Sequence, residues 1–211
     1  RGLGDVYKRQ KSMCLLYSGA VNSCVLSSFA IYRGVALEID KGRLAEATQI
    51  PSENQDERPQ EEISLIVIHG ISLPEGQFGG PHIRELFCNT LDCSRYPGFA
   101  SLEDVRVSSH LVIDRAGYIE QFVSFLDRAW HAGESSYQGR RNCNDFSIGI
   151  ELEGSDNVPY TRAQYIKLAD VCQLLRETYG VSEVVGHKDV APGRKTDPGD
   201  SFDWDHFRSL I

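Results

Sequence analysis

The sequence lacks several patterns that mark well-known classes of protein. No two cysteines are separated by just two residues, which excludes a zinc ribbon, and the absence of an H-E-x-x-H segment argues against a generic metallopeptidase. No internal repeat is found. Basic residues are outnumbered, 22 Lys and Arg against 30 Asp and Glu, and the formal net charge is -8. Since phosphate backbones are bound through basic surfaces, this charge argues against nucleic acid as the main partner.

Cysteine is present without a recognisable framework. The six cysteines are Cys14, Cys24, Cys88, Cys93, Cys143 and Cys172. An even number permits disulfides, but the spacing is irregular and the chain is not a small one. We interpret the thiols as mostly buried and reduced, which favours a cytosolic protein. With 211 residues, 41% of them hydrophobic, the chain is long enough for one domain with a sizeable core, although two small domains would also fit.

Methionine is almost absent, and the first 34 residues differ in character from the rest. The only methionine is Met13, and residues 12–32 carry no charge and are mildly apolar, diluted by serines. Three interpretations stay open for residues 1–34: a signal peptide, a membrane anchor, or upstream translation outside the functional protein, which would then start at Val35. We expect residues 1–34 not to conform with the rest and residues 35–211 to form the functional domain.

The remaining residues alternate between predicted strands and helices. Strands are predicted at 64–69, 146–154 and 181–185, and a β-hairpin at 105–123 that turns at Gly117. Helices are predicted at 37–49, 82–91, 161–179 and 203–210. The third has the strongest signals, a capping box at Thr161 and Gln164 and a terminating Gly180. This order predicts an α/β fold, a single domain with a central mixed β-sheet flanked by helices.

One turn-rich loop, residues 186–199, concentrates chemically versatile side chains. It follows the strand at 181–185, its glycines and prolines prevent helix or sheet from continuing, and it carries His187, Lys195 and Asp197 within eleven residues. Imidazole and carboxylate are zinc ligands, and a lysine can stabilise an oxyanion. Taken alone, the same loop is also compatible with a surface turn whose charges are solvated.

Two predicted strands offer partners for this loop. The apolar run 64–69 ends in His69, which we expect to emerge at the edge of the sheet. In the strand at 146–154 the residues alternate, so Glu151 and Glu153 share a face with Gly149. Two carboxylates beside a glycine indicate a face that lines a cleft, and an ordinary half-exposed strand is the alternative.

These stretches together resemble the zinc-dependent N-acetylmuramoyl-L-alanine amidases of the amidase-2 and peptidoglycan-recognition superfamily, and most of all its branch that acts in cell-wall recycling. The resemblance runs in order from about Glu38 to the end of the chain. Its segments are VIHGISLP (67–74), QFGGP (77–81), RAWHAG (128–133), SSYQGR (135–140), CNDFSIGIELEG (143–154) and GHKDVAPGRKTDPG (186–199). The resemblance implies the same α/β fold, and it covers so many unusual segments that it is highly specific.

The resemblance also implies roles for individual residues. It carries the zinc ligands onto His69, His187 and Asp197, the general base onto Glu151 and the group that stabilises the oxyanion onto Lys195. The substrate-binding residues that it suggests are Arg106, His110, Trp130 and His131. For the two histidines of that set, support of the metal ligands is an alternative to contact with the sugar. Trp130 is either a stacking platform or a core residue, and Arg106 either binds a substrate carboxylate or is an exposed strand residue.

Four further positions either match no site of the superfamily or depart from its pattern. His82 and His206 lie on predicted helices and match no site of the superfamily, so we assign them no role. Gly70 stands where recycling relatives commonly have asparagine, and Asn142 stands where they can have a second substrate arginine. These two departures concern peptide recognition and leave the expected metal site intact.

The function that we expect is hydrolysis of the amide between (1,6-anhydro-)N-acetylmuramic acid and the L-alanine of the stem peptide, with Zn2+ as cofactor. The expected partner is a muropeptide or peptidoglycan fragment, and neither nucleic acid nor, for residues 35–211, a membrane is expected. The expected location is cytoplasmic, or periplasmic if residues 1–34 act as a signal. The alternatives are an exported amidase that acts on intact cell wall and a non-catalytic peptidoglycan-binding module.

Overall fold

A six-stranded mixed sheet forms the centre of the computed structural model, which describes residues 37–211. The segment 1–34 and its interpretations, with Cys14 and Cys24, lie outside the described residues. In the order of the sheet, the strands are β12 (Glu183–Gly186), β5 (Leu65–Ile71), β11 (Ser147–Glu153), β6 (Leu111–Ile113), β7 (Ile119–Gln121) and β3 (Thr48–Gln49). The first four are parallel, β7 is antiparallel to β6, and β3 is parallel to β7. The predicted α/β class with a mixed sheet is confirmed.

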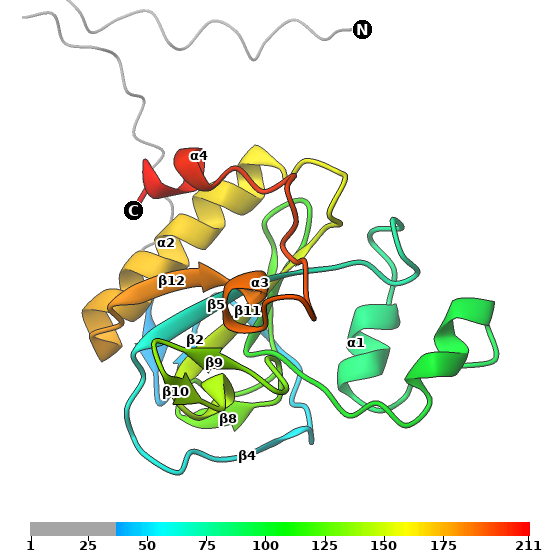
Figure 1. Ribbon diagram of the computed structural model, residues 1–211, viewed down its shortest axis with the longest axis horizontal. Helices are drawn as coiled ribbons and strands as arrows, with labels where there is room; N and C mark the ends of the chain where they lie inside the picture. The colour runs from blue at the N-terminus through cyan, green and yellow to red at the C-terminus, as the bar shows by residue number, and fades with distance from the viewer. Residues whose placement is uncertain (1–36) are drawn as a thin grey trace, which may run out of the picture. The chain divides into compact units, whose positions relative to one another are not determined.

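Helix α2 (Arg162–Tyr179) lies along one face of this sheet, with the short α4 (Trp204–Arg208) beside it (Figure 1). The predicted capping box is present, since Thr161 accepts from the backbone N–H of Gln164 and the Gln164 side chain accepts from that of Thr161. The helix ends at Gly180, whose φ of 72° suits a residue without Cβ. Buried side chains of α2 pack on the alternate residues Ile148, Ile150 and Leu152 of β11 to form the main core.

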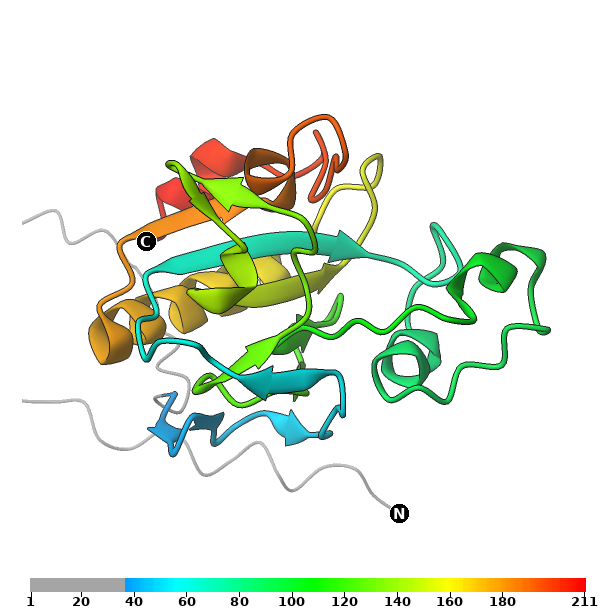
Figure 2. The ribbon, with the colours of Figure 1, turned by 60° about the horizontal axis from the view of Figure 1, so that its bottom comes forward.

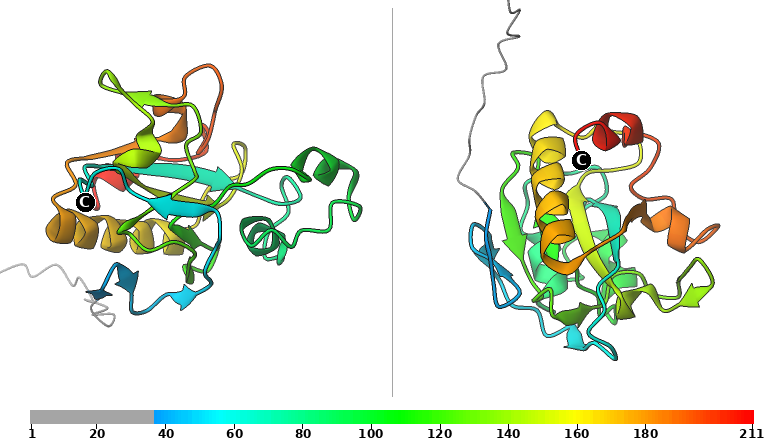
Figure 3. Two further views of the ribbon diagram at one scale, coloured as in Figure 1. Left: turned by 90° about the horizontal axis from the view of Figure 1, so that it is seen from below. Right: turned by 90° about the vertical axis from the view of Figure 1, so that its left-hand side faces the viewer.

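Shorter elements lie on the opposite face and beyond the end of β5. They are α1 (His82–Phe87), the 3-10 turns η1 (Pro97–Leu102) and η2 (Cys143–Asp145), the hairpin β9 (Ser136–Tyr137) and β10 (Arg140–Arg141), and α3 (His187–Val190). Figure 2 and Figure 3 show the hairpin and α3 on the side of the sheet away from α2, and the α1–η1 segment projecting past the end of β5. A sheet face covered by several short pieces leaves room for a cleft between them.

The helix predicted at 37–49 is wrong. This segment forms the short strands β1 (Ile39–Asp40), β2 (Arg43–Leu44) and β3, with a turn at Lys41 and Gly42, whose φ angles are 47° and 77°. A helix cannot pass through positive φ angles, and the buried Gln121 side chain accepts the N–H of Leu44 at 2.7 Å. Tertiary pairing with β7 thus replaces a weak helical pattern. The polar segment that follows contains β4 (Gln55–Glu57), which pairs with β8 (Asp127–Ala129).

Other expectations hold with shorter limits. The hairpin at 105–123 is present, but only residues 111–113 and 119–121 pair. The loop predicted at 186–199 contains the four-residue helix α3. Among the described cysteines none forms a disulfide; Cys143 and Cys172 are buried, whereas Cys88 and Cys93 are half-buried. Within residues 37–211, no helix has the length and apolar character needed to cross a membrane.

Candidate active site

The parallel pairing of β12 with β5 brings His69 and His187 together. Gly186 pairs with Ile68, so the residue that follows each of them is a histidine, His187 at the start of α3 and His69 in β5, and the two rings approach each other. Asp197 lies close to both histidines because the 186–199 loop folds back, and the backbone N–H of Lys188 donates to the Asp197 carbonyl at 3.0 Å. The Nδ1 atoms of His69 and His187 are 2.9 Å apart, and Asp197 Oδ2 lies 3.2 Å from the first and 3.0 Å from the second. Three ligand-type atoms therefore converge on one point.

The outer hydrogen bonds fix which ring nitrogens face that point. Ser147 donates its hydroxyl to the Cys143 carbonyl at 2.5 Å, so its Oγ accepts from His131 Nε2 at 3.1 Å. His131 Nδ1, without a proton in the neutral ring, then accepts from His69 Nε2 at 3.0 Å. His187 Nε2 donates to the Ala132 carbonyl at 3.2 Å. In their neutral forms, His69 and His187 thus both present a bare Nδ1 to the centre.

This donor set fits a zinc ion. Tetrahedral ligands about 2.0–2.1 Å from zinc lie roughly 3.3 Å from one another, close to the three separations here. Burial lowers the pKa of His69 to about 4, although Asp197 acts in the opposite direction. The imidazole of His69 is therefore neutral at pH 7. Burial alone would raise the pKa of Asp197, but its close contacts with the His187 and His69 rings hold that pKa well below the usual range, so a carboxylate faces the two imidazoles. Two lone pairs and a carboxylate directed at one point repel each other unless a cation lies between them.

Glu151 lies beside this centre without belonging to it. It pairs with His69 in the register of β11 and β5, and its Oε1 is 4.0 Å from His69 Nδ1. The side chain is 8% exposed in total, and its Oε2 has no hydrogen-bond partner among the described residues. Burial, with Asp197 nearby, raises the pKa of Glu151 well above its usual range, while Lys195 lowers it. A buried carboxyl group with a free oxygen is suited to exchanging a proton.

A cleft of about 360 Å³ opens at Asp197 and Lys195. Its walls come from the ends of β5 and β11 and from the 186–199 loop; its lining includes Ser72, Glu75, Ser155 and Arg194. Gly70 also lines it, and a Cβ at this position would lie 2.2 Å from the Tyr160 hydroxyl. Tyr160 in turn donates to the carbonyl of Pro198 at 2.9 Å, next to Asp197. A tyrosine thus fills the space in which a side chain at position 70 would lie.

The alternative of a half-exposed strand at 146–154 is wrong, because every residue of β11 is buried. Glu153 is 5% exposed and accepts from the backbone N–H groups of Gly79 and, at 3.4 Å, Arg115. It therefore holds the loop at 74–80 against the end of the sheet. The two carboxylates of β11 have different surroundings, and only Glu151 faces the cluster of His69, His187 and Asp197.

The four residues expected to bind substrate are not gathered in one place. His131 bonds to His69, which favours the alternative that it supports a metal ligand. His110 is 0% exposed; its Nδ1 accepts from the Gly149 N–H and its Nε2 donates to the Asp127 carbonyl, so a substrate contact would need these bonds to change. Trp130 is half-buried, and its side chain is close enough to Asp56 to lower the pKa of that carboxyl group. Arg106 is exposed and donates to nearby backbone carbonyls.

Sequence reasoning missed the groups that orient the ligands. Ser147, the carbonyl of Ala132 and the side chain of Asn144 all take part in bonds around the two histidines. A backbone carbonyl leaves no mark in a sequence, and Ser147 and Asn144 stand in a strand and a turn where polar residues are common. The half-buried Arg58, which donates to the carbonyls of Asn144, Asp145 and Ser147, was also missed because its surroundings are non-local.

The chain is similar in sequence to known N-acetylmuramoyl-L-alanine amidases. The model of the family Amidase_2, described as N-acetylmuramoyl-L-alanine amidase, matches residues 59–200. The 1,6-anhydro-N-acetylmuramyl-L-alanine amidase AmpD of Citrobacter freundii is 54% identical over 82% of this chain and 94% of its own length. AmpD of Escherichia coli (strain K12) is 52% identical, over 82% of this chain and 96% of its own length.

The solved structures agree with these relatives. A crystal structure of a Se-Met AmpD derivative has a TM-score of 0.81 and 54% identity, covering 82% of this chain and 99% of that one. The amidase AmiD from E. coli, solved in complex with the substrate anhydro-N-acetylmuramic acid-L-Ala-D-gamma-Glu-L-Lys, has a TM-score of 0.53 and 27% identity, covering 83% and 65%. The expected resemblance to recycling amidases is confirmed.

Proposed function

Since the chain belongs to the Amidase_2 family of N-acetylmuramoyl-L-alanine amidases, we propose that it is a zinc enzyme that releases stem peptides from 1,6-anhydro-N-acetylmuramic acid during peptidoglycan recycling. The class of reaction, hydrolysis of the muramyl–L-alanine amide, follows from the family. The anhydro sugar is proposed because relatives named for it align over almost their whole length. The metal is proposed from the donor set of His69, His187 and Asp197.

Zinc at this triad would lower the pKa of water to about 7 and so supply a nucleophile at neutral pH. Glu151 is placed to take the proton that the attacking water loses. The same carboxyl group can then give that proton to the alanine nitrogen, as the bond between the lactyl carbonyl carbon and this nitrogen breaks. Its burial favours the first step, because a carboxylate with a raised pKa is a better base.

Lys195 is proposed to stabilise the negative charge that develops on the carbonyl oxygen. It is exposed and lines the cleft together with Asp197. An ammonium group aimed at an oxyanion typically contributes about 3 kcal/mol to the transition state. The single observation that carries the proposal is the combination of two bare imidazole nitrogens and one carboxylate beside the buried, partly unpartnered Glu151.

The substrate proposal is tested by comparing three substrates at equal peptide concentration. They are a 1,6-anhydromuramyl tripeptide, the corresponding reducing muramyl tripeptide and intact peptidoglycan sacculi. We expect free tripeptide from the anhydro substrate with the highest kcat/KM and little release from sacculi. Faster release from sacculi would instead support an amidase of intact wall, and tight binding without any release would support a binding module.

We also propose a cytosolic location, as the resemblance implies for an enzyme of recycling. Fractionation of the native host would place the activity with cytosolic markers. Recovery with periplasmic markers, together with removal of residues 1–34, would favour the exported alternative.

A further inference from the structure

Two consecutive residues, His131 and Ala132, contact both histidines of the proposed metal centre. The ring of His131 accepts from His69 Nε2 at 3.0 Å, and the carbonyl of Ala132 accepts from His187 Nε2 at 3.2 Å. The orientation of both ligands therefore depends on where this dipeptide lies. A partner beyond the ligands commonly fixes the tautomer and direction of a metal-bound histidine.

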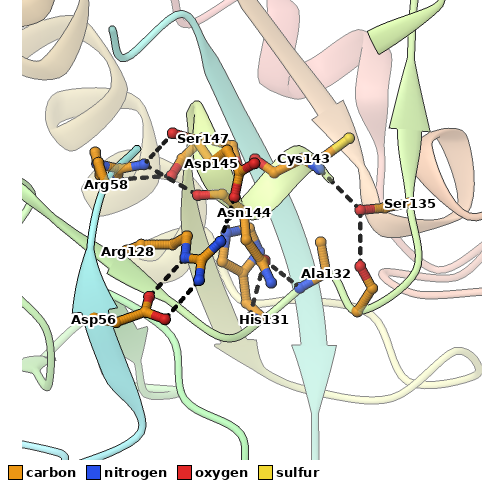
Figure 4. A network of polar contacts seen from close by, with 11 residues as sticks. Asp56, Arg58, Arg128, His131, Ala132, Ser135, Cys143, Asn144, Asp145 and Ser147 are labelled. Carbon is orange, nitrogen blue, oxygen red and sulfur yellow. Dashed lines mark hydrogen bonds and ion pairs between the residues drawn. The ribbon is translucent and has the colours of Figure 1, made fainter. Parts of the chain in front are cut away.

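One side-chain atom holds this dipeptide in place. Asn144 Oδ1 accepts from the backbone N–H of His131 at 3.2 Å and from that of Ala132 at 2.8 Å (Figure 4). Because both donors are backbone N–H groups, the atom that faces them must be the amide oxygen and not the amide nitrogen. His131 and Ala132 lie in a loop without regular sheet pairing, so their own secondary structure does not fix them.

Asn144 is itself held on several sides. It lies in η2, where Arg58 donates to the carbonyls of Asn144 at 3.1 Å and Asp145 at 3.3 Å. Arg128 donates to Asp145 Oδ1 at 2.5 Å and, from its other nitrogens, to the Asp56 carboxylate, as Figure 4 shows. These bonds join β4, β8 and η2 and give the Asn144 oxygen a fixed position.

The sheet is also shaped to receive the His131 ring. A Cβ at Gly149 would lie 2.4 Å from His131 Cγ, so only glycine at this position allows the ring to pack directly on β11. The far side of the ring reaches the Ser147 hydroxyl on the same strand. The dipeptide is thus held through its backbone by Asn144 and through its ring by β11.

We propose that Asn144 is a positioning residue of the metal centre: by holding the two N–H groups of His131 and Ala132, it presents one hydrogen-bond acceptor to each ligand histidine. This inference rests on the proposed function, since it takes His69 and His187 as zinc ligands. Asn144 touches neither the metal ligands nor the substrate cleft. Its effect should therefore reach the metal affinity and geometry through the dipeptide.

The test measures the dissociation constant for Zn2+ of the full chain by competition with a chromophoric chelator. Asn144→Ala and Asn144→Leu remove the acceptor oxygen, and we expect zinc to bind roughly 10-fold to 100-fold more weakly. Asn144→Asp keeps an acceptor oxygen in the same place and should recover most of that loss. The absorption spectrum of the Co2+-loaded protein, which reports ligand geometry, should change for Ala and Leu and stay close to wild type for Asp.

Asn89→Ala is the matched control for lost stability. Asn89 has a φ of 58° and donates to Asn54 Oδ1 at 3.1 Å, away from the metal ligands, so its replacement should lower thermal stability without changing zinc affinity. Wild-type affinity in folded Asn144→Ala and Asn144→Leu would overturn the inference and leave the proposed function standing. Equal weakening in Asn144→Asp would overturn it as well, because the acceptor would then be irrelevant. Wild-type protein that binds no zinc would refute the proposed metal centre itself.

Discussion

Replacing Gly149 by alanine tests how tightly the site is packed against the sheet. An added Cβ would lie 2.4 Å from Cγ of His131 and 2.7 Å from its Cδ2 and Nδ1. The ring would have to retreat by about 1 Å to restore ordinary contact, because β11 is held between β5 and β6. Such a shift would break the bonds of this ring to His69 and Ser147, which are 3.0 Å and 3.1 Å long.

The expected loss of folding stability is the sum of two effects, the clash with the His131 ring and the loss of its two hydrogen bonds. Overpacking of a buried site typically costs about 1–3 kcal/mol, and leaving buried polar groups without partners costs about 1–3 kcal/mol more. We therefore expect Gly149→Ala to lower the free energy of unfolding by about 3 kcal/mol and to weaken zinc binding by at least about 10-fold. Urea unfolding of the zinc-free protein, followed by circular dichroism, measures the first effect, and chelator competition measures the second.

A control variant and a double variant test whether the lost stability of Gly149→Ala comes from the clash with His131. Gly98→Ala adds a methyl group where no atom lies within 4 Å, and it should change the free energy of unfolding by less than about 0.5 kcal/mol. In the Gly149→Ala background, His131→Ala should restore part of the lost stability because it removes the ring that clashes. The reasoning is refuted if Gly149→Ala unfolds within about 0.5 kcal/mol of wild type.

Three further predictions concern single side chains. Glu151→Gln should lower kcat by about 10²–10⁴ with unchanged zinc content, as measured by product release and metal analysis; a near-normal kcat would exclude it as the base. Lys195→Met should lower kcat by about 10²–10³ with a smaller change in KM, and a pure KM effect would contradict its role at the oxyanion. Asp56→Asn should cost about 1 kcal/mol or less at pH 7 in urea unfolding. Because the hydrogen bond from Arg128 lowers the folded-state pKa of Asp56, this difference should begin to shrink as the pH falls below about 4 and should vanish once the pH is below the folded-state pKa. A difference that does not shrink between about pH 4 and pH 2 would oppose the assignment.

The convergence of His69, His187 and Asp197 can be predicted from the sequence. Both histidines follow apolar runs, and parallel neighbouring strands bring their carboxyl ends to one edge of the sheet. The longest helix was equally accessible, because its capping box and terminal glycine are local signals. These features depend on residues close in the sequence or on a simple rule of strand direction.

The features that sequence reasoning missed depend on partners far along the chain. Residues 37–49 carry a helical pattern. The side chain of Gln121, 77 residues beyond Leu44, nevertheless accepts the N–H of Leu44, and the strand β7 pairs with β3. The burial of Glu153 depends on a loop that folds back over the end of β11. The acceptors of the two ligand histidines are a ring and a carbonyl in an irregular loop, which no periodicity marks.

The structure explains why glycine stands at position 70, where recycling relatives commonly have asparagine. For Asn142, which stands where they can have an arginine, it explains only the local backbone conformation. The Tyr160 hydroxyl occupies the space that a side chain at position 70 would need. Asn142 has a φ of 58°, in the left-handed region that asparagine tolerates better than most residues, and its N–H donates to the Ser135 carbonyl at 2.9 Å. Of the neighbouring arginines, Arg140 pairs with Glu62, while Arg141 lines a separate cavity of about 380 Å³ together with Arg194.

The most direct test of the central claim is mass spectrometry of the products formed when the full chain meets a 1,6-anhydromuramyl tripeptide. The account predicts free tripeptide and free anhydromuramic acid, no release after treatment with a chelator, and recovery of release when zinc is added back. Release that persists in thoroughly chelated protein would contradict the metal mechanism, and no release from zinc-loaded protein would contradict the proposed substrate.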